Sequence, residues 1–335
     1  MQILLYFFKI FLFVLILAVD RYGKIVGFYI GNEPGVILAD FELIKEVYKR
    51  DDVAARPNMT PFCDIRPGHW VVDKENEGKV PGVIFTQGKF WTEQRRFTLR
   101  ALKDLGFGKT SMEDTIMDEV EKLCDELKKF EGKPFKWEGI LNVSVLNGLW
   151  SLLVGEKLQL NDPRLKKIVE LMDKLLRGQG PSGALATMFP FPEMIRWPII
   201  SNIVGLDLET NFQTIDQMKQ VVEAYVEDHK TSLNEDNIRD FLDVYLIEIE
   251  KHRSDKESSF HQERGHYMLI NLLIDLFIAG METTSSAIIW TCLLLLHHPE
   301  SKRRVLAEID LVYIVQYLYT LNVLNYVSSL SLHCL

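Results

Sequence analysis

An apolar stretch from His266 to His298 constrains the fold of this chain more than any other segment. It contains two acidic residues, Asp275 and Glu282, and no lysine or arginine. As one continuous helix it would be about 50 Å long. Such a helix belongs either in the core of a large helical domain or across a membrane, and the residues at its centre bear on the choice.

The centre of that stretch, residues 279–284 (AGMETT), interrupts its apolar character. The small side chains of Ala279 and Gly280 would let a flat or bulky group approach the helix backbone. Thr283 could bond back to a carbonyl and loosen the helix locally, making room for a small ligand or water. Glu282 would need a partner or a proton path in apolar surroundings. The alternatives are a membrane helix with a small-residue packing seam and a core helix that tolerates one polar step.

The first 19 residues, MQILLYFFKIFLFVLILAV, are apolar except for Gln2 and Lys9. As a helix they would span about 28 Å, close to the thickness of the hydrocarbon core of a bilayer. Lys9 could reach the interface from a tilted helix. We therefore predict a membrane anchor at residues 1–19, with a cleaved signal peptide as the alternative. Arg21 and Lys24 follow directly, which predicts a main body in the cytosol.

The rest of the chain predicts a mainly α fold with a small β-sheet. Short alternating runs between glycines and a proline indicate a β-hairpin or meander over 22–39. Asp40 is placed to cap a helix that runs to Arg50. A proline- and glycine-rich loop is predicted at 56–88, and a proline–aromatic break at 178–206. Amphipathic helices are predicted at 89–104, 111–131, 138–154, 163–177, 211–232 and 238–253.

Trp91 and Arg95 lie four residues apart in the first of these helices, so they share one face. An indole N–H beside a guanidinium is a donor pair suited to a carboxylate or a phosphate. A surface cation–π pair is the plainer alternative. Six basic and two acidic residues occur between Lys89 and Lys109, a local net charge of +4. This basic segment would steer an acidic partner, unless it is an ordinary solvated helix face.

The overall composition excludes several classes of protein. The chain has 38 basic and 47 acidic residues, a formal charge of −9, which argues against a nucleic-acid binder. The four cysteines, Cys63, Cys124, Cys292 and Cys334, form no C-x-x-C pair. They therefore exclude a disulfide scaffold or a zinc ribbon, suit a reducing compartment, and predict no metal site. The final 25 residues, 311–335, contain no Asp, Glu, Lys or Arg.

Several motifs together resemble one family. AGMETTS lies in the long apolar helix, WTEQRRFTLR is followed by GFGK, DFLDVYL precedes the long helix, and HHPESKRRVLAEID follows it. In this order they resemble a microsomal cytochrome P-450, a haem-thiolate monooxygenase of the animal enzymes that oxidise drugs, steroids and juvenoids. The resemblance extends over about residues 22–310 and implies the cytochrome P-450 fold.

The resemblance implies catalytic and haem-binding roles for the centre of the long helix. Ala279 and Gly280 would flank the distal face of the haem. Glu282 and Thr283 would be the catalytic acid–alcohol pair that relays protons to dioxygen at the iron.

It also implies roles for the basic segment and the proline-rich loops. Trp91 and Arg95 would bind a haem propionate, and the basic residues beside them would receive an NADPH-dependent cytochrome reductase. The loop at 56–88 and the break at 178–206 would line substrate entry near the membrane. The predicted anchor agrees with the endoplasmic reticulum, with the body facing the cytosol.

The chain departs from the family towards its C-terminus. The family holds its iron through a cysteine in a Phe-x-x-Gly-x-x-x-Cys-x-Gly loop, and none of the four cysteines lies in such a loop. All matches to the family's Glu-x-x-Arg pair precede the required place after Asp310. We therefore predict an incomplete cytochrome P-450 fold that lacks its C-terminal haem-thiolate part. Its segments would be an anchor at 1–19, a partial domain at 20–310 and a non-family hydrophobic tail at 311–335.

The function predicted by resemblance is NADPH- and O2-dependent oxidation of a hydrophobic small molecule such as a steroid, a juvenoid or a xenobiotic, with haem as cofactor. Because the cysteine ligand is missing, we expect this chain to be inactive alone. The alternative is a non-catalytic, membrane-anchored fragment that binds lipid or competes for the reductase. A third hypothesis, a membrane protein with spans at 1–19, 267–296 and 311–335, is disfavoured by Asp275 and Glu282 within the second span.

Overall fold

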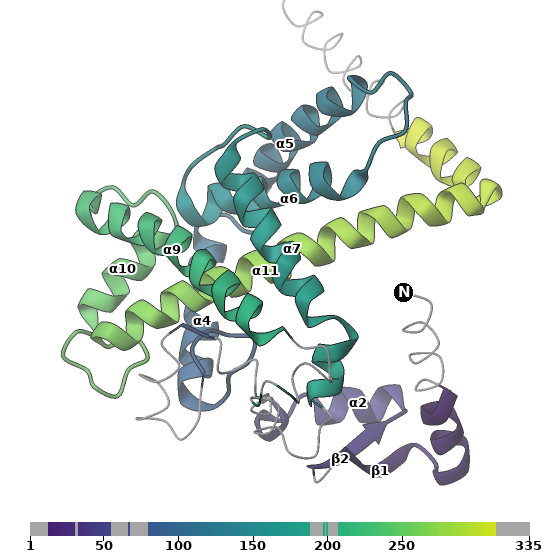
Figure 1. The fold of residues 1–335 in the computed structure, drawn as a ribbon, viewed down its shortest axis with the longest axis horizontal. Coiled ribbons are helices and arrows are strands. Elements are labelled where there is room, and N and C mark those ends of the chain that lie inside the picture. The colour runs from purple at the N-terminus through teal and green to yellow at the C-terminus, as the bar shows by residue number, and fades with distance from the viewer. Residues whose placement is uncertain are drawn as a thin grey trace, which may run out of the picture. The chain divides into compact units, whose positions relative to one another are not determined.

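The computed structural model describes residues 13–30, 33–54, 66–67, 80–187, 197, 199 and 207–312. The chain divides into two compact units, Met1–Met281 and Glu282–Leu335. The described part is mainly helical, with its strands in one N-terminal hairpin (Figure 1), as the fold class predicts. Residues 1–12 of the predicted anchor, 313–335 of the predicted tail, and most of the predicted loop and break lie outside the described residues.

The predicted hairpin is confirmed. Strands β1 (Ile25–Ile30) and β2 (Glu33–Leu38) pair in antiparallel register. Alternation along β1 buries Val26 and leaves its neighbours more exposed, as expected for a strand with one covered face. Gly35 lies against the Phe28 ring, where an added Cβ would come within 2.6 Å of a ring carbon. The turn side of the hairpin therefore depends on the absence of a side chain at Gly35.

The helices follow the predicted order, and several of their ends differ from the predicted positions. The Asp40 side chain accepts a hydrogen bond from the Leu43 N–H and caps α2 (Phe41–Val47) as predicted, but α2 ends before the predicted Arg50. A short 3-10 helix, Asp51–Val53, follows. The longer helices of the first unit are α4 (Gly88–Asp104), α5 (Thr110–Lys128), α6 (Trp137–Val154), α7 (Pro163–Thr187), α9 (Leu208–Ser232), α10 (Phe241–Lys251) and the first part of α11 (Gln262–His297).

Helix α7 is longer than predicted. The expected break at residue 178 is wrong, because the helix continues through Pro181 to Thr187. Proline has a fixed φ near the helical value, so an internal proline costs the helix one hydrogen bond and a local bend without necessarily ending it. Pro163 occupies the first position of α7, where the missing N–H has no helical partner in any case.

The core of the first unit lies where α6, α7, α9 and α10 meet the first part of α11. Leu269, Leu273 and Phe277 recur every four residues on α11 and are at most 1% exposed. Phe277 stacks on Trp150 of α6 at a centroid distance of 5.3 Å, and burial of each such side chain contributes about 1.5–3 kcal/mol. The first part of α11 is therefore a core helix.

The second unit contains the remainder of α11 and a helix over residues 299–312. Among the helices that the structure describes, α11 is the one long and apolar enough to cross a membrane. Its first part is packed in the core of the first unit, which disfavours the three-span hypothesis. The second part exposes large apolar side chains: Ile288, Trp290, Leu293, Leu294 and Leu296.

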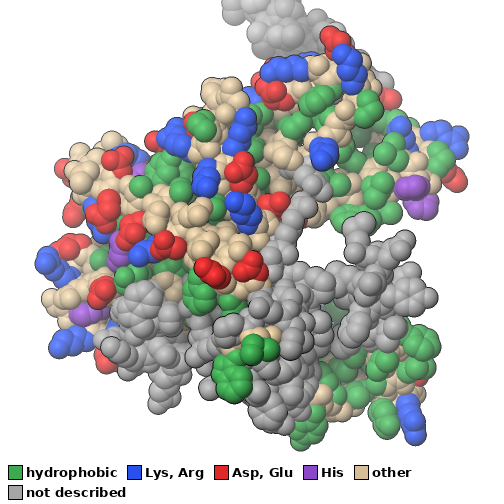
Figure 2. Space-filling view, in the orientation of Figure 1, with side chains coloured by type: hydrophobic (Ala, Val, Ile, Leu, Met, Phe, Trp, Pro, Cys, Tyr) green, Lys and Arg blue, Asp and Glu red, His purple; other side chains and the backbone are tan. Residues whose placement is uncertain are grey.

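The N-terminal region carries many exposed apolar side chains. Residues 13–22 are helical, and Phe13 is 60% exposed. In the hairpin, Tyr29 is 74% exposed and Val36 63%. Figure 2 shows hydrophobic side chains over this region, at the lower right, whereas acidic and basic side chains intermix over α9 and α10. The N-terminal surface therefore suits an apolar environment, and the surface over α9 and α10 suits water.

Candidate functional site

A cavity of about 670 Å³ lies beside α4 in the first unit. Its volume falls within the range of about 300–1,000 Å³ that is usual for small-molecule and cofactor sites. Of the described residues that line it, most are apolar, and the one that carries a charge is Arg95. This composition suits a large apolar ligand that carries an anionic group. The lining residues are Tyr48, Val53, Ala54, Val83, Ile84, Thr86, Trp91, Arg95, Thr98, Leu99, Leu102 and Leu276.

One stripe of α4 forms a wall of this cavity. Trp91, Arg95, Thr98 and Leu102 follow the spacing of a single helix face, and all four line the cavity. The Arg95 guanidinium lies over the Trp91 ring, 5.6 Å from its centroid. The structure thus brings the predicted pair together, in the stacked form that sequence reasoning left as the alternative. Within the described residues, no carboxylate pairs with the Arg95 guanidinium.

The Trp91 indole has a different partner from the one expected. Its Nε1–H donates a hydrogen bond to the backbone carbonyl of Val83, at 3.1 Å. One donor of the predicted pair is therefore engaged by the loop before α4. The Arg95 guanidinium is the group of the pair that an anion in the cavity would meet.

A buried aspartate fixes that loop. Asp275 of α11 forms an ion pair with Arg66, and the two side chains are 1% and 4% exposed. The second carboxylate oxygen of Asp275 accepts hydrogen bonds from the backbone N–H groups of Val83, at 2.7 Å, and Ile84, at 3.1 Å. A buried carboxylate is stable only with such partners. We call Asp275, Arg66 and these two N–H groups the Asp275 clamp.

The clamp leaves no room for a side chain at Gly82. This residue has a φ of +105°, and an added Cβ would lie 2.5 Å from the Asp275 carboxylate and 2.6 Å from the Arg66 guanidinium. Asn271, one turn earlier on α11, donates to the carbonyl of Pro67 at 2.7 Å. Helix α11 therefore positions the loop that supplies Val83, Ile84 and Thr86 to the cavity wall.

The opposite face of α4 is anchored as well. Glu93 accepts hydrogen bonds from the Ser258 hydroxyl, at 2.8 Å, and the Ser259 N–H, at 2.7 Å. Gln94 donates to the Ser259 hydroxyl at 2.8 Å and accepts from the Tyr245 hydroxyl at 2.6 Å. These contacts join α4 to α10, through Tyr245, and to the segment between α10 and α11, through Ser258 and Ser259. They fix the rotation of α4, and so the direction in which Trp91 and Arg95 project.

The predicted residues at the centre of α11 lie in one uninterrupted helix. Ala279 and Gly280 belong to the first unit but are not among the residues that line the cavity, where Leu276 represents α11. An added Cβ on Gly280 would lie 2.9 Å from the end of the Leu149 side chain of α6. The small size of Gly280 is thus used here in helix packing.

The predicted acid–alcohol pair lies in the second unit. The Ser286 hydroxyl donates to the Glu282 carboxylate at 3.1 Å, a contact between residues one turn apart. Thr283 is exposed, and the helix continues through it without interruption. The local loosening expected at Thr283 does not occur.

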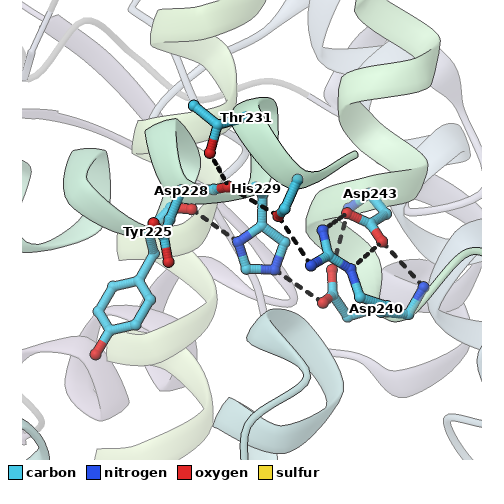
Figure 3. A network of polar contacts seen from close by, with 8 residues as sticks. Tyr225, Asp228, His229, Thr231, Asp240 and Asp243 are labelled. Atoms are coloured by element: carbon cyan, nitrogen blue, oxygen red, sulfur yellow. Dashed lines mark hydrogen bonds and ion pairs between the residues drawn. The ribbon is translucent and has the colours of Figure 1, made fainter. Parts of the chain in front are cut away.

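A second buried polar cluster lies at the junction of α9 and α10 (Figure 3). The two ring nitrogens of His229 contact the Tyr225 carbonyl, at 2.8 Å, and the Asp240 carboxylate, at 2.9 Å. Asp240 caps α10 by accepting the Asp243 N–H at 3.0 Å. Arg239 forms two side-chain hydrogen bonds of 2.7 Å to the Asp243 carboxylate. We call these residues the His229 cluster.

The electrostatics of the His229 cluster follow from its ion pairs. Burial by itself would lower the pKa of His229, but the hydrogen bond and charge of Asp240 outweigh burial, and the pKa is raised. Burial opposes ionisation of Asp243 too, yet Arg239 lowers the pKa of that carboxyl. Both shifts favour the charged forms, as in other paired buried groups.

The cluster has the residue types of a metal centre but not the available atoms. One ligand atom each from His229, Asp240 and Asp243 lies within 4.8 Å of the others. Both nitrogens of His229 are engaged, however, and Arg239 binds both oxygens of Asp243. A cation would have to displace these partners. The cluster therefore serves as a junction between two helices.

Sequence reasoning missed the groups that support the cavity. Asp275 was considered only as a cost within a membrane span, and Arg66 only as part of a long loop. A signal for Asp275 was available, since a single acid in an apolar core helix requires a buried partner. Thr98 was also within reach, because it lies on the same face of α4 as Trp91 and Arg95. The partner of Asp275 could not be inferred from spacing.

Comparison with known proteins gives consistent results. The family model described as Cytochrome P450 matches residues 7–317. Cytochrome P450 2L1 of Panulirus argus is 31% identical over 291 residues, covering 87% of this chain and 56% of that protein. Human cytochrome P450 2J2 is 32% identical over 299 residues, covering 88% and 55%. The chain thus spans about half the length of the curated relatives that it matches.

A solved structure matches the fold. The structure of a zebrafish cytochrome P450 with progesterone superposes with a TM-score of 0.65, at 24% identity, over 87% of this chain and 62% of that one. This likeness supports the arrangement of helices and the small sheet, and so the predicted fold class. The family model spans most of the sequence, including α4 and α11. The chain belongs to the cytochrome P450 family.

Proposed function

We propose that this chain forms a haem-holding portion of a cytochrome P450 monooxygenase. The observation that carries the proposal is the cavity beside α4, because its described walls combine apolar side chains with one guanidinium, Arg95, which stacks on Trp91 and pairs with no described carboxylate. Haem is a flat apolar ring with two carboxylates. The ring would lie against Val83, Ile84 and Leu276, and Arg95 would hold a carboxylate.

The residues fit the ring and its carboxylate better than they fit the iron. The family ligates iron through a cysteine thiolate. Of the described cysteines, Cys124 is exposed on α5 and Cys292 lies in the second unit, and neither lines the cavity. We therefore propose haem binding by this chain without thiolate ligation, and no monooxygenase activity by the chain alone.

Haem ligated by a thiolate would supply reductive activation of O2 for oxidation of a hydrophobic small molecule such as a steroid, a juvenoid or a xenobiotic. In that reaction the Thr283 hydroxyl would donate a hydrogen bond to dioxygen, and the Glu282 carboxyl would pass protons to the Thr283 hydroxyl. The contact from Ser286 to Glu282 supports this role by orienting the carboxyl. Ala279 and Gly280 do not line the cavity, so their predicted place beside the ring rests on the motif that they share with the family.

Haem titration of the 335-residue chain tests the proposal. Arg95→Gln should weaken haem binding about ten-fold or more, since a charge-assisted hydrogen bond contributes about 1.5–3 kcal/mol. Arg96→Gln is the matched control, because Arg96 is exposed and does not line the cavity. Equal haem affinity in the two variants would contradict the role of Arg95. A reduced-CO band typical of thiolate-ligated haem would contradict the absence of a thiolate.

A second function, binding of an NADPH-dependent reductase, is favoured by the surface of α4. Arg96, Arg100 and Lys103 are exposed, and the ion pairs found in the described residues include none of them. A basic face without internal acidic partners suits an acidic flavoprotein. This version matches the fragment hypothesis in which the chain competes for the reductase.

Reductase binding should be strong at low salt and lost at high salt. Reversal of charge at Arg96, Arg100 and Lys103 together should abolish capture of the reductase, while reversal at Lys122, Lys128 and Lys129 on α5 should not. Undiminished capture after reversal on α4 would remove this function.

We further propose that the chain lies at the endoplasmic reticulum membrane with its body in the cytosol. The supporting observation is the exposed apolar surface of residues 13–22 and of the hairpin, which suits contact with lipid. Alkaline carbonate extraction should leave the chain in the membrane fraction, and release by carbonate would contradict the proposal.

A further inference from the structure

Two threonines in the cavity wall have buried hydroxyl groups without partners. Thr86 is 2% exposed and Thr98 is 4% exposed, and both line the cavity. Within the described part of the chain, neither hydroxyl oxygen has a hydrogen-bond partner. Buried hydroxyls are usually paired, so each of these calls for an explanation.

Thr98 differs from three other helical threonines of this chain. A threonine inside a helix commonly donates to the carbonyl four residues earlier. Thr92 does so to Gly88 at 3.1 Å, Thr214 to Thr210 at 2.7 Å, and Thr291 to Ala287 at 2.8 Å. Thr98, in the middle of α4, makes no such bond. Its hydroxyl is therefore not used by its own helix.

An unpaired buried hydroxyl destabilises the protein without ligand. Its desolvation costs about 1–3 kcal/mol, and valine has nearly the same shape without that cost. A hydroxyl at such a position is explained if it donates to a group that is bound in the cavity. Thr86 and Thr98 both line the same cavity.

The surroundings of the two hydroxyls select an acceptor that carries negative charge. Arg95 lies one turn before Thr98 on the same face of α4. Among the described residues that line the cavity, none is acidic. Thr86 belongs to the loop that the Asp275 clamp fixes, so it is held on a rigid support. A guanidinium and two hydroxyls form a donor set for carboxylate oxygens.

We propose that Thr86 and Thr98 donate hydrogen bonds to a haem carboxylate that Arg95 also binds. The set works without an iron ligand, so it binds a metal-free porphyrin as well. This inference rests on the proposed haem function and assigns it two further binding residues. The carboxylate of a hydrophobic substrate is the competing source of the same chemistry.

The test compares binding with the stability of the ligand-free chain. Protoporphyrin IX, which lacks iron, is titrated by fluorescence against the wild-type chain, Thr98→Val and Thr86→Val. Each variant should bind about three- to ten-fold more weakly, the range expected for one lost hydrogen bond. The urea midpoint of each ligand-free variant should be unchanged or higher. Thr92→Val is the matched control and should bind as the wild type does, since Thr92 does not line the cavity.

The dimethyl ester of protoporphyrin IX separates the carboxylate from the ring. Wild-type affinity for the ester should fall, and the difference between wild type and Thr98→Val should disappear. Unchanged protoporphyrin affinity together with a lower urea midpoint in Thr98→Val would overturn the inference and leave haem binding intact. A folded wild-type chain that binds neither porphyrin would overturn the proposed function and this inference together. If Thr98→Val weakened the binding of dodecanoic acid but not that of protoporphyrin IX, the hydroxyls would be assigned to a substrate carboxylate instead.

Discussion

The Asp275 clamp and the His229 cluster are built from the same parts and serve different purposes. In each, a buried aspartate contacts a cationic or ionisable partner and accepts backbone N–H groups. In each, the carboxylate lies against a glycine with positive φ, Gly82 at +105° and Gly155 at +74°. Burial, charge and strain are therefore alike in the two regions.

What differs is the element that each aspartate holds. Asp275 contacts Arg66 and a loop almost two hundred residues earlier in the chain, and that loop forms part of a cavity wall. Asp240 contacts His229 across the short connection between neighbouring helices. A buried polar network is thus a weak sign of function by itself. The sign becomes useful when the network supports an open, ligand-sized space.

The largest expected effect is a loss of stability when the buried ion pair of the Asp275 clamp is broken, compared with an exposed ion pair. Asp275→Asn removes the carboxylate that pairs with the buried Arg66 guanidinium and should lower the free energy of unfolding by about 3–5 kcal/mol. Urea denaturation measures this change. Asp52→Asn, in the exposed pair with Arg50, is the control and should have little effect. Unfolding of both variants at similar urea concentrations would contradict the claim that the clamp stabilises the fold more than a surface pair does.

Substitutions at Gly82, beside the Asp275 clamp, and Gly155, beside the His229 cluster, test whether two similarly strained regions differ in function. Gly82→Ala and Gly155→Ala each place a Cβ against a carboxylate, 2.5 Å and 2.6 Å away, in a backbone conformation that alanine disfavours. Each should lower stability by about 1–3 kcal/mol. Only Gly82→Ala should also weaken haem binding, measured by titration at a temperature where both variants are folded. Equal losses of haem affinity would remove the distinction between the regions.

The Trp91 indole tests how the clamp and the cavity are coupled. Trp91→Phe keeps an aromatic surface for Arg95 but loses the hydrogen bond to Val83. Stability should fall by about 1 kcal/mol, while haem affinity should change less than it does in Arg95→Gln. Paired denaturation and titration measure the two quantities. A loss of affinity equal to that of Arg95→Gln would mean that the indole turns to the ligand carboxylate.

The smallest effect concerns the pH response of the His229 cluster. The folded pKa of His229 is raised above its ordinary value of 6.5, so protonated His229 stabilises the fold. This contribution is fully present below pH 6.5 and is lost as the pH rises through the raised pKa. His229→Gln should therefore be less stable than wild type at pH 6, by 1 kcal/mol or less on the scale of about 1.4 kcal/mol per unit of pKa, and the difference should shrink by pH 9.

Urea midpoints of both proteins across this pH range measure the difference. Burial and the nearby Lys230 lower the pKa of His266, so this residue affects stability on the acid side of 6.5. Because His266 is present in both proteins, its contribution cancels in the comparison. A difference that grows with rising pH would reverse the assigned sign.

Local pattern predicted most of the elements. Two of these predictions depend only on neighbours within a few residues: the alternation of β1 and β2, and the position of Asp40 before α2. Both are confirmed. The predicted end of α7 is wrong because local pattern does not include the packing of the whole helix, on which the cost of Pro181 depends. Spacing also brought Trp91 and Arg95 onto one face, because that geometry belongs to the helix itself.

The candidate site was predicted only in part. The periodicity of α4 identified the face that forms the cavity wall, but not the partner that the indole would choose. Val83 is near in sequence, yet its carbonyl is available to Trp91 because the loop is held by Asp275. The roles of Glu282 and Thr283 stay predictions, based on the motif that they share with the family.

The sequence by itself determined the family, the helical class and the faces of the helices, because these depend on residue type and on spacings of three or four residues. Only the tertiary structure decided which charges meet. Arg66 and Asp275 lie 209 positions apart, and no periodicity relates them. Within the described residues, Thr98 has no hydrogen-bond partner and Arg95 has no carboxylate partner. This too was decided by tertiary structure, since the partners of a polar group depend on what the fold brings against it.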